Sequence, residues 1–251
     1  MKKTVPFCIV LIAMLAVATA VHASDNEVSL ELKLWSNAWK ETVRPAKGPS
    51  QDLDNGRELM AGPSLNVRFL KDWFAGMTYL SSFGDYESSG WFASGDSMKF
   101  KRTDVDLWAG YLLRDPYNDV KVGFFVAYKQ IKAPATYTNR AAGLNDVDAG
   151  TWKLRGPGLG VLVEKNLDET TLLHGSLAYL FLEEEFAFAS GAASRFDAGG
   201  WNFEASVKHA FTTEISANVG VQFQRVQGER TNGDRVTDSF SGLTAGIGYT
   251  F

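Results

Sequence analysis

The last nine residues, LTAGIGYTF (243–251), alternate between apolar residues and small or polar ones. The apolar positions are Leu243, Ala245, Ile247, Tyr249 and Phe251, and the residues between them are threonine and glycine. Successive side chains of a β-strand point to opposite faces. This segment is therefore predicted to be a strand with one apolar face and one small or polar face, ending on an aromatic residue.

The same period of two recurs along the chain from Asn26 onward, and no stretch has the spacing of an amphipathic helix. The apolar positions of the other clear runs lie within 28–34, 65–69, 105–113, 122–128, 159–163, 177–181, 203–207 and 215–223. An aromatic run from Trp73 to Phe83 has ambiguous parity. Counting it gives ten predicted strands.

The predicted connections alternate between short and long. Short ones fall near 70–72, 114–119, 166–170 and 211–213, and longer, polar or Gly- and Ala-rich ones near 41–57, 84–98, 132–150, 187–199 and 228–234. This pattern is typical of transmembrane barrels with tight periplasmic turns and longer outer loops. We therefore predict an all-β, up-and-down antiparallel transmembrane β-barrel of about ten strands, with eight or twelve as alternatives. A soluble periplasmic barrel would show the same alternation of apolar and polar residues, so it remains a second alternative.

The N-terminus has the anatomy of a secretory signal peptide. Lys2 and Lys3 precede an apolar run at 5–21, and a small-residue pattern follows before Ser24. We expect residues 1–23 to be cleaved after export through the Sec pathway, which leaves residues 24–251 as the barrel. The single cysteine, Cys8, lies in the expected signal peptide. Disulfides and thiolate metal sites are therefore not expected.

Composition excludes several classes of protein. The chain is 45% hydrophobic and 22% charged, too polar for a bundle of membrane helices, and its 13% aromatic content is too high for a disordered chain. The formal net charge is −4. With that balance and no basic patch, nucleic acid is not an expected partner.

Aromatic residues are predicted to gather in two belts near the strand ends, as they do at membrane interfaces. Those near the short turns are Phe69, Trp73, Tyr111, Tyr117, Phe211, Tyr249 and Phe251. Those near the other ends are Trp39, Tyr79, Phe83, Tyr128, Phe181 and Phe223.

The final eight residues, TAGIGYTF (244–251), resemble the C-terminal assembly signal of Gram-negative outer-membrane barrels. The resemblance rests on Thr244, Gly246, Tyr249 and the terminal Phe251. It implies an outer-membrane location and recognition by the barrel assembly machinery. Periplasmic chaperones, outer-membrane lipid and lipopolysaccharide are then the expected partners.

The stretch DVDLWAGYLLRDPYNDVKVGFFVAY (104–128) resembles a strand, turn and strand of the omptins, ten-stranded outer-membrane proteases. That family cuts peptides with an Asp pair and an Asp–His pair across the outer rim. Asp85 and Glu87 are candidates for the first pair, but residues 182–186 read LEEEF, without the required histidine. A general base near neutral pH is then missing, so omptin-type proteolysis is not expected.

The sequence offers two further candidate sites. His174 and Ser176 share one strand face, but no third orienting group is evident, so both His174 and His209 are interpreted as interfacial side chains near the periplasmic turns. A hydrolase acting on lipid A or peptides remains an alternative. Residues 183–185 are three glutamates, interpreted as a solvated rim in preference to a calcium site. No metal or cofactor is expected.

The residues alternating with the apolar positions are predicted to form a polar network in the lumen. Its members are Glu31, Lys33, Arg68, Asp104, Asp106, Lys121, Glu204 and Lys208. A ten-stranded barrel is narrow, so charges of both signs predict a mostly plugged polar lumen with at most a narrow water path. The expected function is a non-enzymatic structural or surface-binding protein, or a narrow pore.

Overall fold

The structure, a computed structural model, describes residues 27–88, 96–114, 119–139, 143–230 and 232–251. The predicted signal peptide, its Cys8 and the turn residue Tyr117 lie outside these ranges. Within them, no helix is long and apolar enough to cross a membrane.

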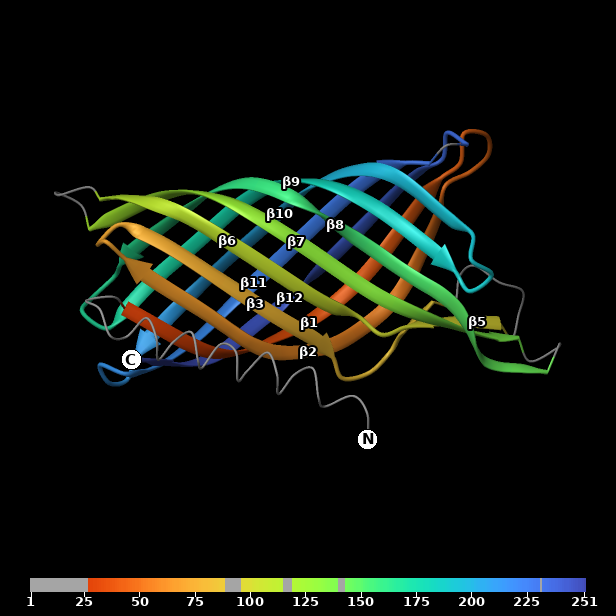
Figure 1. The fold of residues 1–251 in the computed structure, drawn as a ribbon. Coiled ribbons are helices and arrows are strands. Elements are labelled where there is room, and N and C mark those ends of the chain that lie inside the picture. The colour runs from red at the N-terminus through yellow and green to blue at the C-terminus, as the bar shows by residue number, and fades with distance from the viewer. Residues whose placement is uncertain (1–26, 89–95, 115–118, 140–142, 231) are drawn as a thin grey trace.

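Ten antiparallel strands close into a barrel, which confirms the predicted fold (Figure 1). They are β1 (Glu27–Arg44), β2 (Gln51–Phe69), β3 (Trp73–Ser82), β6 (Thr103–Arg114), β7 (Val120–Asn139), β8 (Leu144–Asn166), β9 (Thr171–Phe188), β10 (Ala193–Ala210), β11 (Ile215–Glu229) and β12 (Arg235–Thr250). The barrel closes between β1 and β12, in register from Ser29 opposite Thr250 to Arg44 opposite Arg235. Closure leaves neither strand with an unpaired edge, as a membrane requires.

Two further short strands, β4 (Tyr86–Ser88) and β5 (Asp96–Phe100), lie between β3 and β6 in the chain. They pair with each other, and β5 also pairs with β7, with Phe100 opposite Ala135. We refer to β4 and β5 as the β4–β5 pair. It lies at the end of the barrel opposite the C-terminus (Figure 1).

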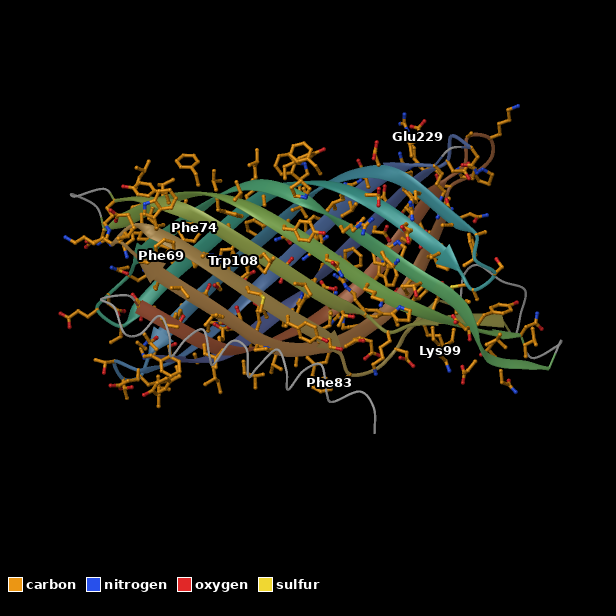
Figure 2. All side chains as sticks on the ribbon, in the orientation of Figure 1. Phe69, Phe74, Phe83, Lys99, Trp108 and Glu229 are labelled. Carbon is orange, nitrogen blue, oxygen red and sulfur yellow. The ribbon has the colours of Figure 1, made fainter. Side chains whose placement is uncertain are left out.

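The strands run further than the alternation suggested. Much of the predicted long connections at 41–57 and 132–150 is strand, and β8 alone has 23 residues. Polar strands continue to satisfy each other's backbone groups beyond the apolar segment, so loss of apolar alternation does not mark a strand end. We call this end, with Lys99 and Glu229, the long-strand end, and the opposite end, with Phe69, the short-turn end (Figure 2).

The connection between β2 and β3 shows how a short turn is held. Leu70 and Lys71 both adopt left-handed backbone conformations, with φ of 49° and 67°. Arg114, at the end of β6, donates to Asp72 Oδ1 over 2.7 Å and to the Lys71 carbonyl over 2.6 Å. The end of β6 is therefore tied to the residues that connect β2 and β3.

The outer face of the barrel is apolar and carries aromatic contacts. Near the short turns, Trp73 packs edge-on against Tyr111 with centroids 5.3 Å apart. About midway along β9 and β10, Tyr179 packs edge-on against Trp201 with ring centroids 4.9 Å apart. Trp39, predicted for this outer belt, instead lies inside the lumen and is only 2% exposed. Its odd-numbered position shares the lumen face of β1 with Lys33, which parity along the strand dictates.

The C-terminal residues close the barrel at the short-turn end. Thr244 is buried and Gly246 lies beside the Glu31 carboxylate, so both are on the lumen side of β12. Tyr249 and Phe251 form an edge-on ring pair 5.0 Å apart, and the Phe251 amide donates to the Val28 carbonyl. The last residue is thus tied directly to the first described strand.

A candidate functional site in the barrel lumen

The lumen divides into a hollow half and a filled half. The hollow half is a cavity of about 310 Å³ that reaches the first residue of β1, Glu27, and Arg68 near the end of β2. Both lie at the short-turn end. The cavity is large enough for a small molecule.

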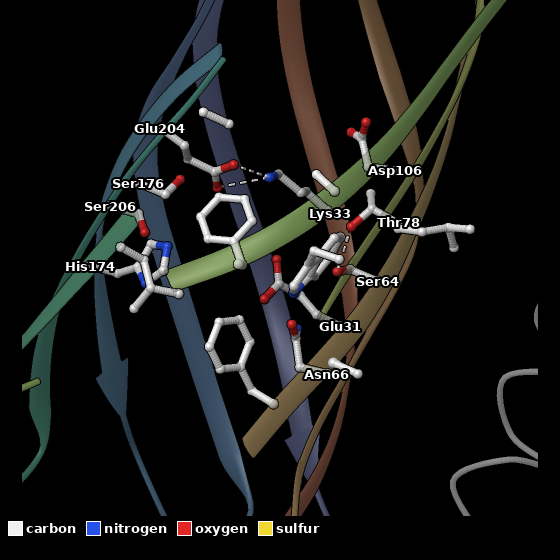
Figure 3. Close-up of a pocket in the computed structure, with 18 of the residues that line it drawn as sticks. Glu31, Lys33, Ser64, Asn66, Thr78, Asp106, His174, Ser176, Glu204 and Ser206 are labelled. Carbon is white, nitrogen blue, oxygen red and sulfur yellow. Dashed lines mark hydrogen bonds and ion pairs between the residues drawn. The ribbon is translucent and has the colours of Figure 1, made fainter. Parts of the chain in front are cut away.

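An ion pair between Lys33 and Glu204 crosses the cavity (Figure 3). Lys33 Nζ lies 2.8 Å and 2.9 Å from the two carboxylate oxygens. β1 and β10 are separated in the barrel by β12 and β11. The two charges therefore satisfy each other across the interior of the barrel, where each alone would be costly.

A second ion pair spans the lumen nearer the short turns. Arg68 Nη2 lies 2.6 Å and 2.7 Å from the two oxygens of Glu164, which is buried on β8. β3, β6 and β7 separate these two strands. Lys121 stands directly opposite Glu164 in the β7–β8 register.

A cluster of four charged side chains lies between the cavity and the filled half. Lys129 Nζ is 2.7 Å from Asp106 and 3.9 Å from Asp104. Arg102, fully buried, donates Nε and Nη2 to the two oxygens of Asp104, each over 2.6 Å. The two predicted aspartates are thus neutralised by residues of β7 and of the segment before β6.

The structure therefore pairs five of the eight predicted lumen residues: Lys33, Arg68, Asp104, Asp106 and Glu204. Glu31 and Lys208 line the same cavity, and Lys121 is half-buried. The sequence did not single out the partners, which are Arg102, Lys129 and Glu164. Lys129 and Glu164 lie at lumen-facing positions of predicted strands. The alternation along those strands could therefore have identified them as lumen residues.

One wall of the cavity is aromatic because glycines make room for flat rings. A Cβ at Gly76 would overlap the Trp108 indole, and a Cβ at Gly160 would overlap the Phe125 ring. Each ring therefore lies against bare backbone of the neighbouring strand. Phe74, Leu112 and Leu162 complete this apolar wall.

The filled half adds aromatic rings to the buried polar groups of the lumen. At the long-strand end, the lumen is closed by an aromatic plug, defined as Trp39, Tyr86, Phe100, Trp152 and Phe240. Trp39 lies at its centre, 5.1–5.7 Å from the other four rings. Two members come from the β4–β5 pair and three from the barrel wall. An apolar lumen face has the same alternation as an outer face, so the sequence pattern did not distinguish them.

The charged groups at the plug interact with its aromatic side chains. The Arg102 guanidinium lies 4.0 Å above the centroid of Phe240. The Trp39 indole N–H donates to Asp238 Oδ1 over 2.8 Å, and that of Trp152 donates to Glu184 Oε1 over 2.9 Å. Cation–π attraction and hydrogen bonds offset the cost of burying these charges.

Next to the cavity, an acid, an imidazole and a hydroxyl lie in one row. Glu164 on β8 is opposite His174 on β9, and His174 is opposite Ser206 on β10. His174 Nδ1 is 3.7 Å from Glu164 Oε1, and Figure 3 shows His174 and Ser206 on the same wall. All three line the cavity, as does Ser176. His174 is thus a lumen residue and Glu164 is an acid next to it, whereas the sequence predicted an interfacial histidine without one.

The remaining candidates lie away from the cavity. His209 is exposed, with Nδ1 3.2 Å from the Thr171 hydroxyl. Asp85 and Glu87 are exposed at the β4–β5 pair. Glu183 pairs with Arg155 and Glu185 with Lys153 and Arg195. Among the described residues, no group of three or more His, Cys, Asp or Glu side chains is arranged to hold a metal ion.

The fold and its lumen define the class of protein as a ten-stranded outer-membrane-type β-barrel. Among solved structures, the chain is similar to the outer membrane protease OmpT from Escherichia coli, with a TM-score of 0.65 and 13% sequence identity, over 90% of this chain and 97% of that one. This likeness establishes the fold that the omptin resemblance predicted.

Two other barrels match at lower TM-scores. Neisserial surface protein A gives 0.39 at 13% identity, over 91% of this chain and 98% of that one. The Pseudomonas putida toluene transporter TodX gives 0.34 at 10% identity, over 93% and 91%. No protein-family model and no curated protein matches the sequence.

Proposed function

We propose that the chain is a non-conducting outer-membrane barrel with a structural or surface-binding role, oriented with its short turns in the periplasm. The observation that carries this proposal is the aromatic plug, which fills the lumen at the long-strand end. A plug of closely packed aromatic rings offers ions and polar solutes no hydrated route. Of the roles expected from the sequence, the pore is therefore the one disfavoured.

The outer-membrane location is supported by the outer face of the barrel. Large apolar side chains such as Leu32, Val219 and Leu243 are more than half exposed on the strands. In a soluble barrel this continuous apolar face would contact water, whereas lipid would cover it. The short turns then face the periplasm, as in other outer-membrane barrels, and the cavity opens toward that side.

Proteolysis at the outer rim is not part of the proposal. Asp85 and Glu87 are exposed at the β4–β5 pair, and both histidines of residues 24–251 lie near the short turns. The side chains that could form an omptin-type centre are therefore at opposite ends of the barrel.

Conductance in planar bilayers tests the closed lumen. We expect the folded protein to insert without ion current. The double variant Tyr86→Ala/Phe100→Ala removes the two plug rings that come from the β4–β5 pair, and should introduce a measurable current. Phe83→Ala/Phe188→Ala, which removes two exposed rings, is the matched control and should stay silent. Steady current through the unmodified protein would contradict the proposal.

A further inference from the structure

We infer that Glu164, His174 and Ser206 form a serine-hydrolase site inside the barrel that cleaves small carboxylic esters entering from the periplasm. The inference rests on the proposed orientation and closed outer end, and it departs from the sequence-based expectation of a barrel without enzymatic activity. The substrate class is an ester with an apolar acyl or aryl group.

The strand register creates the required order of groups. Side chains directly opposite each other in an antiparallel pair have Cβ atoms about 4.5–5.5 Å apart. His174 is opposite Glu164 on one side and Ser206 on the other. An acid, a base and a nucleophile are thereby held on three adjacent strands, the arrangement of roles that defines a catalytic triad on unrelated folds.

The acid at the end of this row is fixed in position. Arg68 Nη2 donates to both carboxylate oxygens of Glu164. Glu164 Oε1 also lies 3.7 Å from His174 Nδ1. With Nδ1 toward the carboxylate, Nε2 is the nitrogen free to accept the Ser206 proton. Catalytic hydrogen bonds are often long without substrate and shorten when it binds. Glu164 acts here as a positioning residue.

The cavity walls suit an amphipathic ester. The apolar wall with Trp108 and Phe125 can hold an acyl or aryl group, while the reactive row lies on the polar wall. Lys208 lines the cavity two residues from Ser206 on the same face of β10. Its positive charge can stabilise the oxyanion that forms at the ester carbonyl.

The reaction proceeds in two balanced steps. Ser206 Oγ bonds to the ester carbonyl carbon as its proton moves to His174 Nε2, and the carbon–oxygen bond to the alcohol breaks as the alcohol takes that proton. Water then attacks the acyl-serine, gives one proton to His174, and releases the carboxylic acid while the proton returns to Ser206. The net change is ester plus water to acid plus alcohol.

Covalent labelling and turnover test the site in the folded, full-length barrel in detergent. A fluorophosphonate probe should label Ser206, identified by peptide mass spectrometry, and p-nitrophenyl butyrate should be hydrolysed. Ser206→Ala and His174→Ala should each lower turnover by about 100-fold or more. Ser194→Ala, which removes a hydroxyl from the same strand but outside the cavity lining, is the matched control and should retain activity.

The positioning role of Glu164 has its own readout. Glu164→Gln should lower kcat and leave KM unchanged, because the carboxylate contacts the imidazole and not the substrate. Absence of labelling at Ser206, or equal turnover in folded Ser206→Ala, would overturn the inference. A silent bilayer with no labelling would reject the hydrolase alone, whereas ion current with labelling would reject the closed lumen alone.

Discussion

Trp39 donates its indole N–H to Asp238 Oδ1 over 2.8 Å inside the barrel, and both side chains are about 98% buried, at 2% exposure each. The bond joins β1 to β12, the two strands whose pairing closes the barrel. It therefore couples barrel closure to the aromatic plug. Within the described part of the chain, the Trp39 N–H is the side-chain hydrogen-bond donor that contacts this buried carboxylate.

Replacing Trp39 with Phe should destabilise the barrel. The ring is largely retained, but Asp238 loses its donor, which costs about 1–3 kcal/mol for a buried polar group left unsatisfied. Urea unfolding in lipid vesicles measures the free energy. Trp35→Phe is the control, since Trp35 is also fully buried but its Nε1 has no hydrogen-bond partner among the described residues. Equal losses in both variants would show that the hydrogen bond contributes nothing.

The cross-lumen pair of Lys33 and Glu204 predicts a non-additive pair of substitutions. Lys33→Met leaves Glu204 without its cation and should destabilise the barrel by about 1–3 kcal/mol, as should Glu204→Met for the converse reason. The double variant removes both charges and should recover most of that loss. Unfolding free energies of the four proteins form a double-mutant cycle. Additive losses would mean that the two charges act independently.

Much of the fold followed from the sequence because strand parity is a local property. The alternation at 243–251 and in the other runs identified which side chains face the lumen, and Lys33, Arg68 and Glu204 are there. The nearby strand end places Trp39 in the outer belt, whereas its parity matches that of Lys33 and places it in the lumen. The alternation also could not show where strands end, since polar strand segments remain paired beyond it.

The site could be predicted only in part because it depends on register between strands. Parity alone places His174 and Ser176 on one face, as the sequence indicated. The row of Glu164, His174 and Ser206 exists because of how far β8, β9 and β10 are shifted along one another. That shift follows from turn geometry and barrel closure. Glu164 lies 10 positions before His174 in the chain, so the sequence alone does not show that the two are neighbours.

Adding one methyl group at Gly76, beside the aromatic wall of the cavity, should destabilise the barrel. Gly76→Ala would place Cβ within the Trp108 indole, so the ring must move into the cavity at a cost of about 1–3 kcal/mol. The unfolding free energy should fall and p-nitrophenyl butyrate should bind less well. Gly175→Ala on β9 is the control, because its Cβ would meet nothing nearer than 4.0 Å and the backbone is not left-handed. A stable Gly76→Ala protein with unchanged binding would exclude this role for the glycine.

The placement of tryptophans inside and outside the barrel predicts which of them lipid can reach. Trp73 and Trp201 are about half exposed on the outer face, whereas Trp39 and Trp152 are buried in the plug. Bromine on lipid acyl chains quenches indole fluorescence only at close approach. In vesicles of brominated lipid, a protein with Trp73 and Trp201 changed to Phe should therefore lose most of the quenching seen in the unmodified chain. The matched Trp39→Phe/Trp152→Phe variant should keep that quenching, because rings inside the plug never contact lipid. Equal quenching in the two variants would contradict both the membrane-facing belt and the closed interior.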